Sequence, residues 1–142
     1  MKIKPTVLDH IHTNHTSFEV NITLDYNVTF ISGESGVGKS ALYSILEEQA
    51  AEDKWIRCFN YLDKKKGYKQ TIKLSKDKLF VIDNADILLD DSMRGYIALD
   101  GKNQYIIIGR NPTGLVLSMD EIYELNSENK NGKTLFTLRK QF

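Results

Sequence analysis

Three features that the sequence lacks limit what the protein can be. It has one cysteine, Cys58, so no disulfide can form within the chain, and this thiol in its apolar run is expected to be buried and reduced. Lysines and arginines number 19, as do aspartates and glutamates, so the formal net charge is zero. That balance gives no support for a general electrostatic grip on nucleic acid or on an anionic membrane.

Long apolar runs are also missing. No stretch approaches the roughly 20 residues that a transmembrane helix needs, and no signal-peptide core follows the first lysines. We therefore expect no membrane insertion and a cytoplasmic location. The 142 residues are enough for one hydrophobic core, which predicts a single nucleotide-binding domain over residues 1–142.

Four short runs predict β-strands. Phe18–Leu24 alternates apolar and polar residues, a period of two that is typical of a half-buried strand. Val28–Ser32, Leu79–Ile82 and Tyr105–Ile108 are mostly apolar and contain β-branched residues, as buried central strands do. Two further segments predict helices. The apolar residues of Ser40–Asp53 share one face, and Asp90 or Asp91 can cap a short helix that follows.

Two hairpins are expected as well. Trp55–Leu62 and Tyr68–Leu74 flank a lysine-rich turn, while Ile122–Leu125 and Thr134–Leu138 flank the turn dipeptide Asn131-Gly132. Helices between buried strands favour an α/β fold. We predict an α/β sandwich with a mainly parallel central sheet and added antiparallel edge strands or hairpins.

A glycine-rich loop between a buried strand and a helix carries the clearest functional pattern. It fits the spacing G-x-x-x-x-G-K-[ST], in which glycines let backbone N–H groups approach a phosphate and the helix start attracts an anion. Lysine then reaches the β- and γ-phosphates of a nucleotide, and the hydroxyl binds Mg²⁺. The predicted cofactor-binding residues are Gly33, Glu34, Ser35, Gly36, Val37, Gly38, Lys39, Ser40 and Ala41.

A second motif is the apolar strand Leu79–Ile82, which is followed by Asp83. Together the loop and this strand resemble the two nucleotide-binding motifs of the P-loop NTPase superfamily and its small AAA+-like ATPases. The resemblance implies a three-layer sandwich that holds ATP and Mg²⁺. It implies that Lys39 acts on the phosphates and that Ser40 and Asp83 are the metal ligands. The segment Ile106–Asn111 is similar to a strand that ends in a polar sensor, a role that either Arg110 or Asn111 could fill.

One position departs from the family pattern. Many of these ATPases have a glutamate after the strand-end aspartate, and that glutamate polarises the attacking water. Here the pair is Asp83-Asn84, and an asparagine cannot accept a proton at neutral pH. Asp86 or Glu34 could stand in as the base. Nucleotide binding is therefore a firmer prediction than hydrolysis.

Three functions remain open. The first is an ATP-binding protein, a Mg²⁺-dependent ATPase that acts within a larger assembly, on a protein partner or by self-association. The second is a kinase for a small molecule or nucleotide, although the arginines are too scattered for a cationic lid. The third is a nucleotide-gated interaction module with little hydrolysis. The guanine-selecting Asn-Lys-x-Asp is absent, which favours ATP.

Two polar clusters have simpler interpretations. His10, His12 and His15 have spacings that can bind zinc, but they also fit a polar loop. The run Lys64–Lys66 is typical of a solvated turn, with contact to a phosphate-bearing partner as the alternative.

Overall fold

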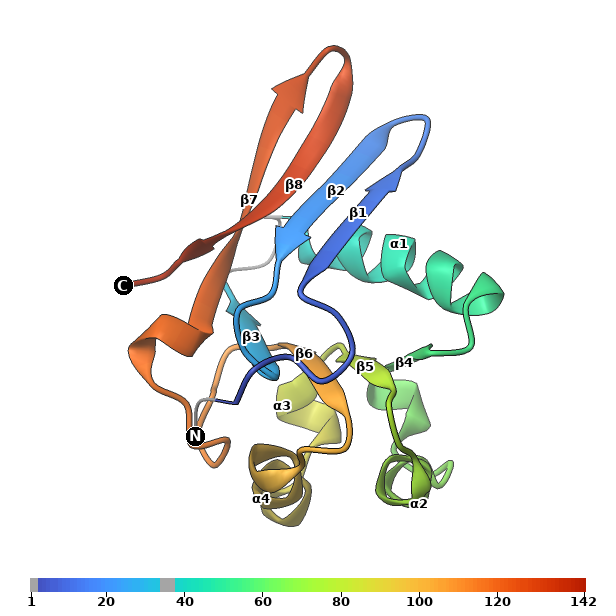
Figure 1. Ribbon diagram of the computed structural model, residues 1–142, viewed down its shortest axis with the longest axis vertical. Helices are drawn as coiled ribbons and strands as arrows, with labels where there is room; N and C mark the ends of the chain where they lie inside the picture. Colours follow the sequence, from blue (N-terminus) through green and yellow to red (C-terminus); the bar gives the residue numbers. More distant parts are fainter. Residues whose placement is uncertain (1–2, 34–37) are drawn as a thin grey trace.

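The protein folds around one curled sheet, which a computed structural model describes for residues 3–33 and 38–142 (Figure 1). Eight described strands join in the order β1-β2-β8-β7-β3-β6-β5-β4. The described elements are β1 His10–Asn14, β2 Phe18–Thr23, β3 Val28–Ser32, α1 Lys39–Glu52, β4 Ile56–Phe59, η1 Tyr61–Asp63, α2 Tyr68–Leu74, β5 Leu79–Ile82, α3 Ala85–Leu88, α4 Asp91–Leu99, β6 Gln104–Ile108, η2 Met119–Glu121, β7 Ile122–Lys130 and β8 Lys133–Lys140.

The sheet is mixed. Strands β4, β5, β6, β3 and β7 run parallel to one another, whereas β8 is antiparallel to β7 and β1 is antiparallel to β2. Strand β2 runs parallel to β8 and links the two hairpins. In Figure 1 both hairpins extend beyond the central strands.

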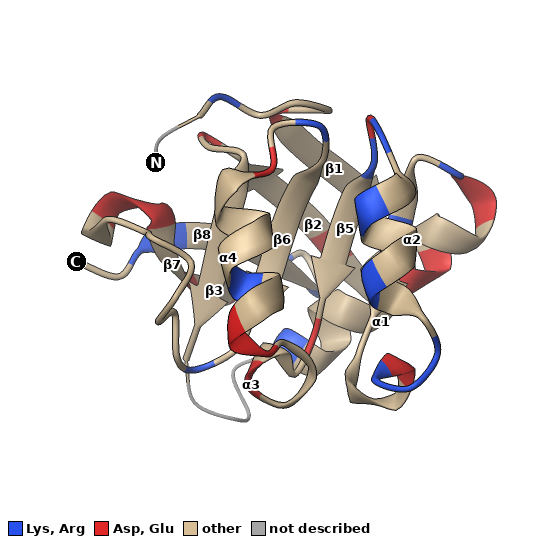
Figure 2. Ribbon diagram, turned by 90° about the horizontal axis from the view of Figure 1, so that it is seen from below, with Lys and Arg blue, Asp and Glu red and all other residues tan. Residues whose placement is uncertain are grey.

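Two hydrophobic cores lie on opposite faces of this sheet. Helix α1 buries Leu42 and Leu46 in the first core, where Val20 and Ile22 of β2 meet them from the curled part of the same sheet. Helices α2, α3 and α4 cover the second face, as the view from below shows (Figure 2). The first core is therefore closed by one helix together with strands of the sheet itself.

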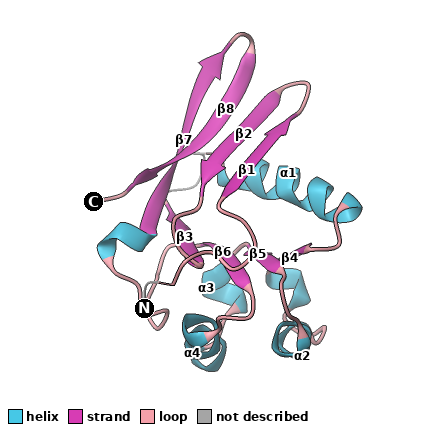
Figure 3. Cartoon of the chain, viewed as in Figure 1, coloured by secondary structure: helices cyan, strands magenta, loops and turns pink. Residues whose placement is uncertain are grey.

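This arrangement corrects the predicted fold. The expected three-layer α/β sandwich with a mainly parallel sheet is wrong, because the structure is a strand-rich, curled mixed sheet with short helices (Figure 3). The assignment to the P-loop NTPase superfamily, which implied that sandwich, is wrong with it. The physical reason is the pair of long hairpins at the sheet edge. Strand twist carries them over the face that a layer of helices would otherwise cover.

One predicted hairpin is also wrong. Tyr68–Leu74 forms helix α2 instead of a strand, and β4 pairs in parallel with β5. Tyr68 and Ile72, four residues apart, are both buried against the second core. That spacing places them on one face of a helix.

Several local predictions are confirmed. Buried strands occupy Val28–Ser32 and Leu79–Ile82, and a hairpin turns at Asn131-Gly132. Asp90 caps α4, since its carboxylate accepts a hydrogen bond from the Met93 N–H at 2.8 Å. Among the described residues no helix combines the length and the hydropathy needed to cross a bilayer.

Candidate functional site

Three neighbouring parallel strands end at one edge of the sheet, and the predicted site residues follow them. The neighbours are β3, β6 and β5, and after them come Gly33, Gly109 and Asp83. Helix α1 begins beside this edge. The space between them is a cavity of about 440 Å³. It is lined by Gly38, Lys39, Ser40, Asp83, Asn84, Asp86, Ile108, Gly109 and Arg110.

The glycine-rich loop is described at its two ends only. Glu34, Ser35, Gly36 and Val37, four of the predicted binding residues, lie outside the described residues. Gly38 has φ 97°, a conformation that suits glycine. A Cβ atom there would also lie 2.6 Å from Cε1 of Phe136 on β8. Glycine is therefore required at position 38 both by the backbone and by the packing of the C-terminal hairpin.

Lys39 stands at the first position of α1, with its ammonium group at the cavity. Its Nζ donates a hydrogen bond to the carbonyl oxygen of Gly33 across the loop. Partial burial lowers the pKa of Lys39, the Arg110 charge lowers it further, and Asp83 and Asp86 oppose the change. A cation removed from water beside a second cation gains most from an anion placed between them.

The start of α1 offers backbone donors as well. The Leu42 N–H donates a hydrogen bond to the Gly38 carbonyl oxygen at 2.9 Å in the first turn. No side chain among the described residues caps this end. Ser40 is exposed on the first turn, and Ala41 directs its methyl group to the first core. The N–H groups of a first turn, together with the helix dipole, favour a bound anion.

Asp83 ends β5 on the opposite side of the cavity. Its Oδ1 accepts a hydrogen bond from the Asn84 N–H at 2.9 Å. Burial raises the pKa of this carboxyl group, while that hydrogen bond and the charge of Lys39 hold the pKa down. Asn84 has φ 52°, which turns the chain sharply into α3. A partly desolvated carboxylate in this place is suited to a divalent cation.

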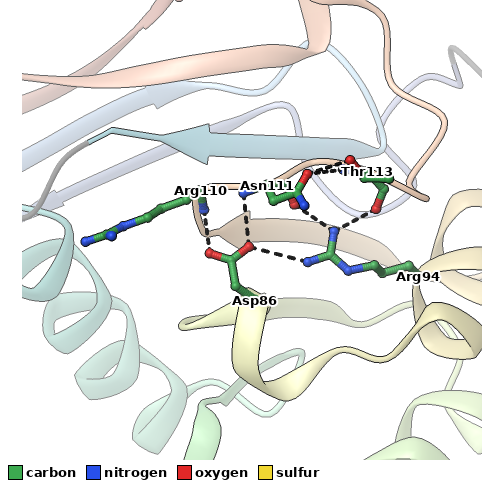
Figure 4. A network of polar contacts seen from close by, with 5 residues as sticks. All are labelled: Asp86, Arg94, Arg110, Asn111 and Thr113. Carbon is green, nitrogen blue, oxygen red and sulfur yellow. Dashed lines mark hydrogen bonds and ion pairs between the residues drawn. The ribbon is translucent and has the colours of Figure 1, made fainter.

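Asp86, predicted as a base, is held by three donors (Figure 4). Its two oxygens accept hydrogen bonds from the N–H groups of Arg110 at 2.8 Å and Asn111 at 3.0 Å. Oδ1 also lies 3.4 Å from Nη2 of Arg94. These three contacts join α3 and α4 to the chain after β6, so Asp86 holds that chain in place.

Asn111 and Arg110 differ in how they face this site. The Asn111 side-chain oxygen accepts hydrogen bonds from the N–H and the hydroxyl of Thr113, so it is used within its own turn. Arg110 extends its side chain away from the Asp86 network and contributes to the cavity wall (Figure 4). Of the two residues that the sequence left open, Arg110 is the one that lines the cavity.

Arg94 is the residue that sequence reasoning missed. Its Nη1 donates to the carbonyl oxygens of Asn111 and Thr113, each at 2.7 Å, from helix α4. Only 7% of its side chain is exposed. Its contacts span 8 to 19 residues of sequence. No local pattern marks such a residue.

The histidines of the N-terminal hairpin are not part of this site. His12 Nε2 lies 2.8 Å from Glu19, and His15 Nδ1 lies 3.4 Å from Glu48. Within the described ranges no three histidine, cysteine or acidic residues are grouped closely enough to hold a metal ion. Comparison of the chain with protein-family models and with curated proteins finds no significant match.

Proposed function

We propose that the protein binds a nucleoside triphosphate, ATP, together with Mg²⁺ in the cavity at the start of α1. One observation carries the proposal. Two cations, Lys39 and Arg110, line one cavity together with the start of a helix of 14 residues, and the carboxylate of Asp83 lines the same cavity. This donor set fits a polyphosphate and its metal ion together, since the cations suit the phosphates and the carboxylate suits the metal.

Each side chain has a role in this proposal. Lys39 and the N–H groups of the first turn of α1 bind the phosphate oxygens, and Arg110 approaches them from the end of β6. Ser40 and Asp83 supply oxygen ligands to Mg²⁺. Bound Mg²⁺ would neutralise phosphate charge, which is the part of phosphoryl chemistry that the metal contributes.

We further propose that the isolated chain hydrolyses ATP slowly. Asp86 is occupied by three donors, and Asn84 cannot act as a base. Glu34 remains the candidate base within the chain. A partner protein or a second copy that adds a cation to the site would then control turnover, which makes the nucleotide a switch for an assembly.

Calorimetric titration with ATP and Mg²⁺ tests the binding proposal. We expect Lys39→Ala to weaken binding at least about a hundredfold, because a charge-assisted contact to phosphate is lost from a partly desolvated site. Lys76→Ala is the matched control, since Lys76 is exposed and does not line the cavity. GTP and a Mg²⁺-free titration run beside them report base preference and metal dependence.

The outcomes separate clearly. Saturable binding by wild type and Lys76→Ala, lost in Lys39→Ala, supports the proposal. Equal affinity in all three proteins, or no binding by folded wild type, contradicts it. Phosphate released without an acceptor would indicate an ATPase, and phosphate found on an added acceptor would indicate a kinase.

A further inference from the structure

A second hollow shares one lining residue, Asp86 of α3, with the cavity at the start of α1. It measures about 470 Å³ and runs between the turn before α2 and the end of α3. Lys64, Lys65 and Lys69 line one side, and Ile87 and Asp90 line the other. We call this feature the lysine groove. In Figure 2 the basic residues of α2 and of the chain before it gather on this part of the molecule.

The charges in the lysine groove are unequally matched. Asp90 contacts the ammonium of Lys69 and also accepts the Met93 N–H at 2.8 Å, and the Lys69 contact holds the pKa of Asp90 below its usual range. Asp86, which also borders the groove, is occupied by Arg94 and two backbone N–H groups. In the described part of the chain, the ammonium groups of Lys64 and Lys65 have no ion-pair partner. The positive charges of Lys64 and Lys65 are therefore available to a negatively charged ligand.

Apolar side chains stand exposed beside those lysines. Ile87 on α3 is 57% exposed, and Leu62 and Tyr61 on η1 are 60% and 49% exposed. The two elements pack against each other, so these side chains lie on adjoining surfaces. A single exposed apolar residue is ordinary, but several together beside unpaired charges are typical of an interaction site.

The walls of the groove are pre-formed. Asn60 accepts the Leu62 N–H at 2.9 Å, and Asp63 accepts the Asn60 N–H at 2.9 Å, which closes η1 in a capping box. The Tyr68 hydroxyl donates to the Leu88 carbonyl oxygen at 2.8 Å and ties α2 to α3. A partner that docks here would lose little energy to ordering the receptor.

We propose that the lysine groove is a docking site for an acidic peptide segment of a partner protein that carries an aliphatic anchor side chain. Lys64 and Lys65 meet its carboxylates, and the anchor packs against Ile87 in the groove. Aliphatic contacts and zero net charge favour such a peptide over a nucleic acid, which needs a broad basic surface. The docking site does not depend on nucleotide binding, so the two proposals can fail separately.

Fluorescence anisotropy with a labelled probe peptide tests this site. The probe is a peptide of glutamates with leucines spaced three and four residues apart, and its comparison is the same peptide without leucine. We expect Lys64→Glu/Lys65→Glu to weaken binding of the leucine peptide about tenfold or more, and Ile87→Asp to weaken it similarly. Added salt should weaken the wild-type complex as well.

Matched variants control for charge and hydropathy. Lys76→Glu/Lys102→Glu makes the same charge change at exposed positions outside the groove, and Leu74→Asp removes an aliphatic side chain that is 87% exposed elsewhere on α2. Both should bind the probe as wild type does. Lys39→Ala should also bind it normally, which keeps a failure of the nucleotide proposal distinct from a failure of this one.

Four results with the probes and the control variants would overturn the proposal. They are no binding of the leucine peptide at millimolar concentration, equal binding of the peptide without leucine, tighter binding of a labelled oligothymidine, and loss of binding in the control variants. Self-association of wild type that is lost in Lys64→Glu/Lys65→Glu would assign the groove to a second copy and would also overturn it. Sedimentation velocity measures that last outcome.

Discussion

At the scale of single residues, Arg94 shows how a buried charge fixes the edge of the candidate site. Its planar guanidinium reaches the Asn111 and Thr113 carbonyl oxygens from one nitrogen and Asp86 from the other. A lysine ammonium is a point charge and could not hold the same fork of acceptors. Arg94 thereby positions the backbone that presents Arg110 to the cavity.

Arg94→Met should lower the free energy of unfolding by about 2–4 kcal/mol, because two carbonyl oxygens and the Asp86 carboxylate lose a charged donor together. Arg139→Met is the control. Arg139 pairs with Glu124 at 3.1 Å but is 64% exposed, so its removal should cost less than about 1 kcal/mol. Urea denaturation of both variants makes the comparison. Equal losses would mean that the Arg94 contacts contribute no more than a surface pair.

The contacts of Arg94 and Asp86 show which part of the site cannot be predicted from the sequence. Local signals, namely glycine spacing and strand ends, pointed to Lys39, Ser40 and Asp83, which line one cavity, and their roles toward a nucleotide stay a prediction. The use of Asp86 as a clamp could not be predicted, since its partners Arg110 and Asn111 lie 24 and 25 residues away. Such contacts exist only once α3 and β6 have been placed side by side.

At the scale of elements, two glycines occupy opposite situations. Gly132 follows Asn131 in the turn between β7 and β8, with φ 79° and 52° respectively. Positive φ at both central residues is the requirement of the tightest hairpin turns, and glycine meets it without strain. Gly95 lies inside α4, and a Cβ atom added there would meet nothing within 4 Å.

Alanine at these two positions should therefore act in opposite directions. Gly95→Ala should stabilise the protein by about 0.5–1 kcal/mol, because alanine restricts the unfolded chain and favours the helix. Gly132→Ala should destabilise it by about 1 kcal/mol through strain in the turn. Thermal unfolding followed by circular dichroism measures both. A loss of stability in Gly95→Ala would show that the helix interior has no room for the methyl group.

Helix α2 explains where element prediction failed. Its seven residues contain β-branched and aromatic side chains, and their alternation fits a strand as well as a helix. Gly67 and the turn before it are compatible with either a strand or a helix. Burial of Tyr68 and Ile72 in the second core favours the helix. That core is assembled from distant segments, so the local sequence does not reveal it.

At the scale of the whole molecule, the sheet connects the two cores. On β6, Ile106 and Ile108 point into the first core, and Tyr105 and Ile107 point into the second. Alternating side chains on one strand necessarily reach both faces. The curl of the hairpins and the order of the strands depend on pairings between distant segments, such as β2 with β8. That is why several strands could be predicted while the architecture could not, and why β1, which the sequence presented as a polar loop, was missed.

Shared strands also predict that the two cores unfold together. Trp55, the one tryptophan, packs against the first core, and Ile97 of α4 is buried in the second. Ile97→Val removes one methylene from the second core and should cost about 1 kcal/mol. If unfolding is two-state, the urea midpoint seen by Trp55 fluorescence should fall by about 0.5 M, given a slope of roughly 2 kcal/mol per molar.

Far-ultraviolet circular dichroism should report the same lower midpoint, because it follows the whole chain. Cys58→Ser gives a comparison within the first core, since the Cys58 side chain packs against that core, as Trp55 does. This substitution should also lower the urea midpoints seen by Trp55 fluorescence and by circular dichroism by the same amount. A Trp55 midpoint that stays at the wild-type value in Ile97→Val would contradict coupling, because the curled half of the sheet would then unfold as a separate unit. Loss of structure around α3 and α4 would in that case leave α1 folded but remove Asp83 and Arg110 from the cavity at the start of α1.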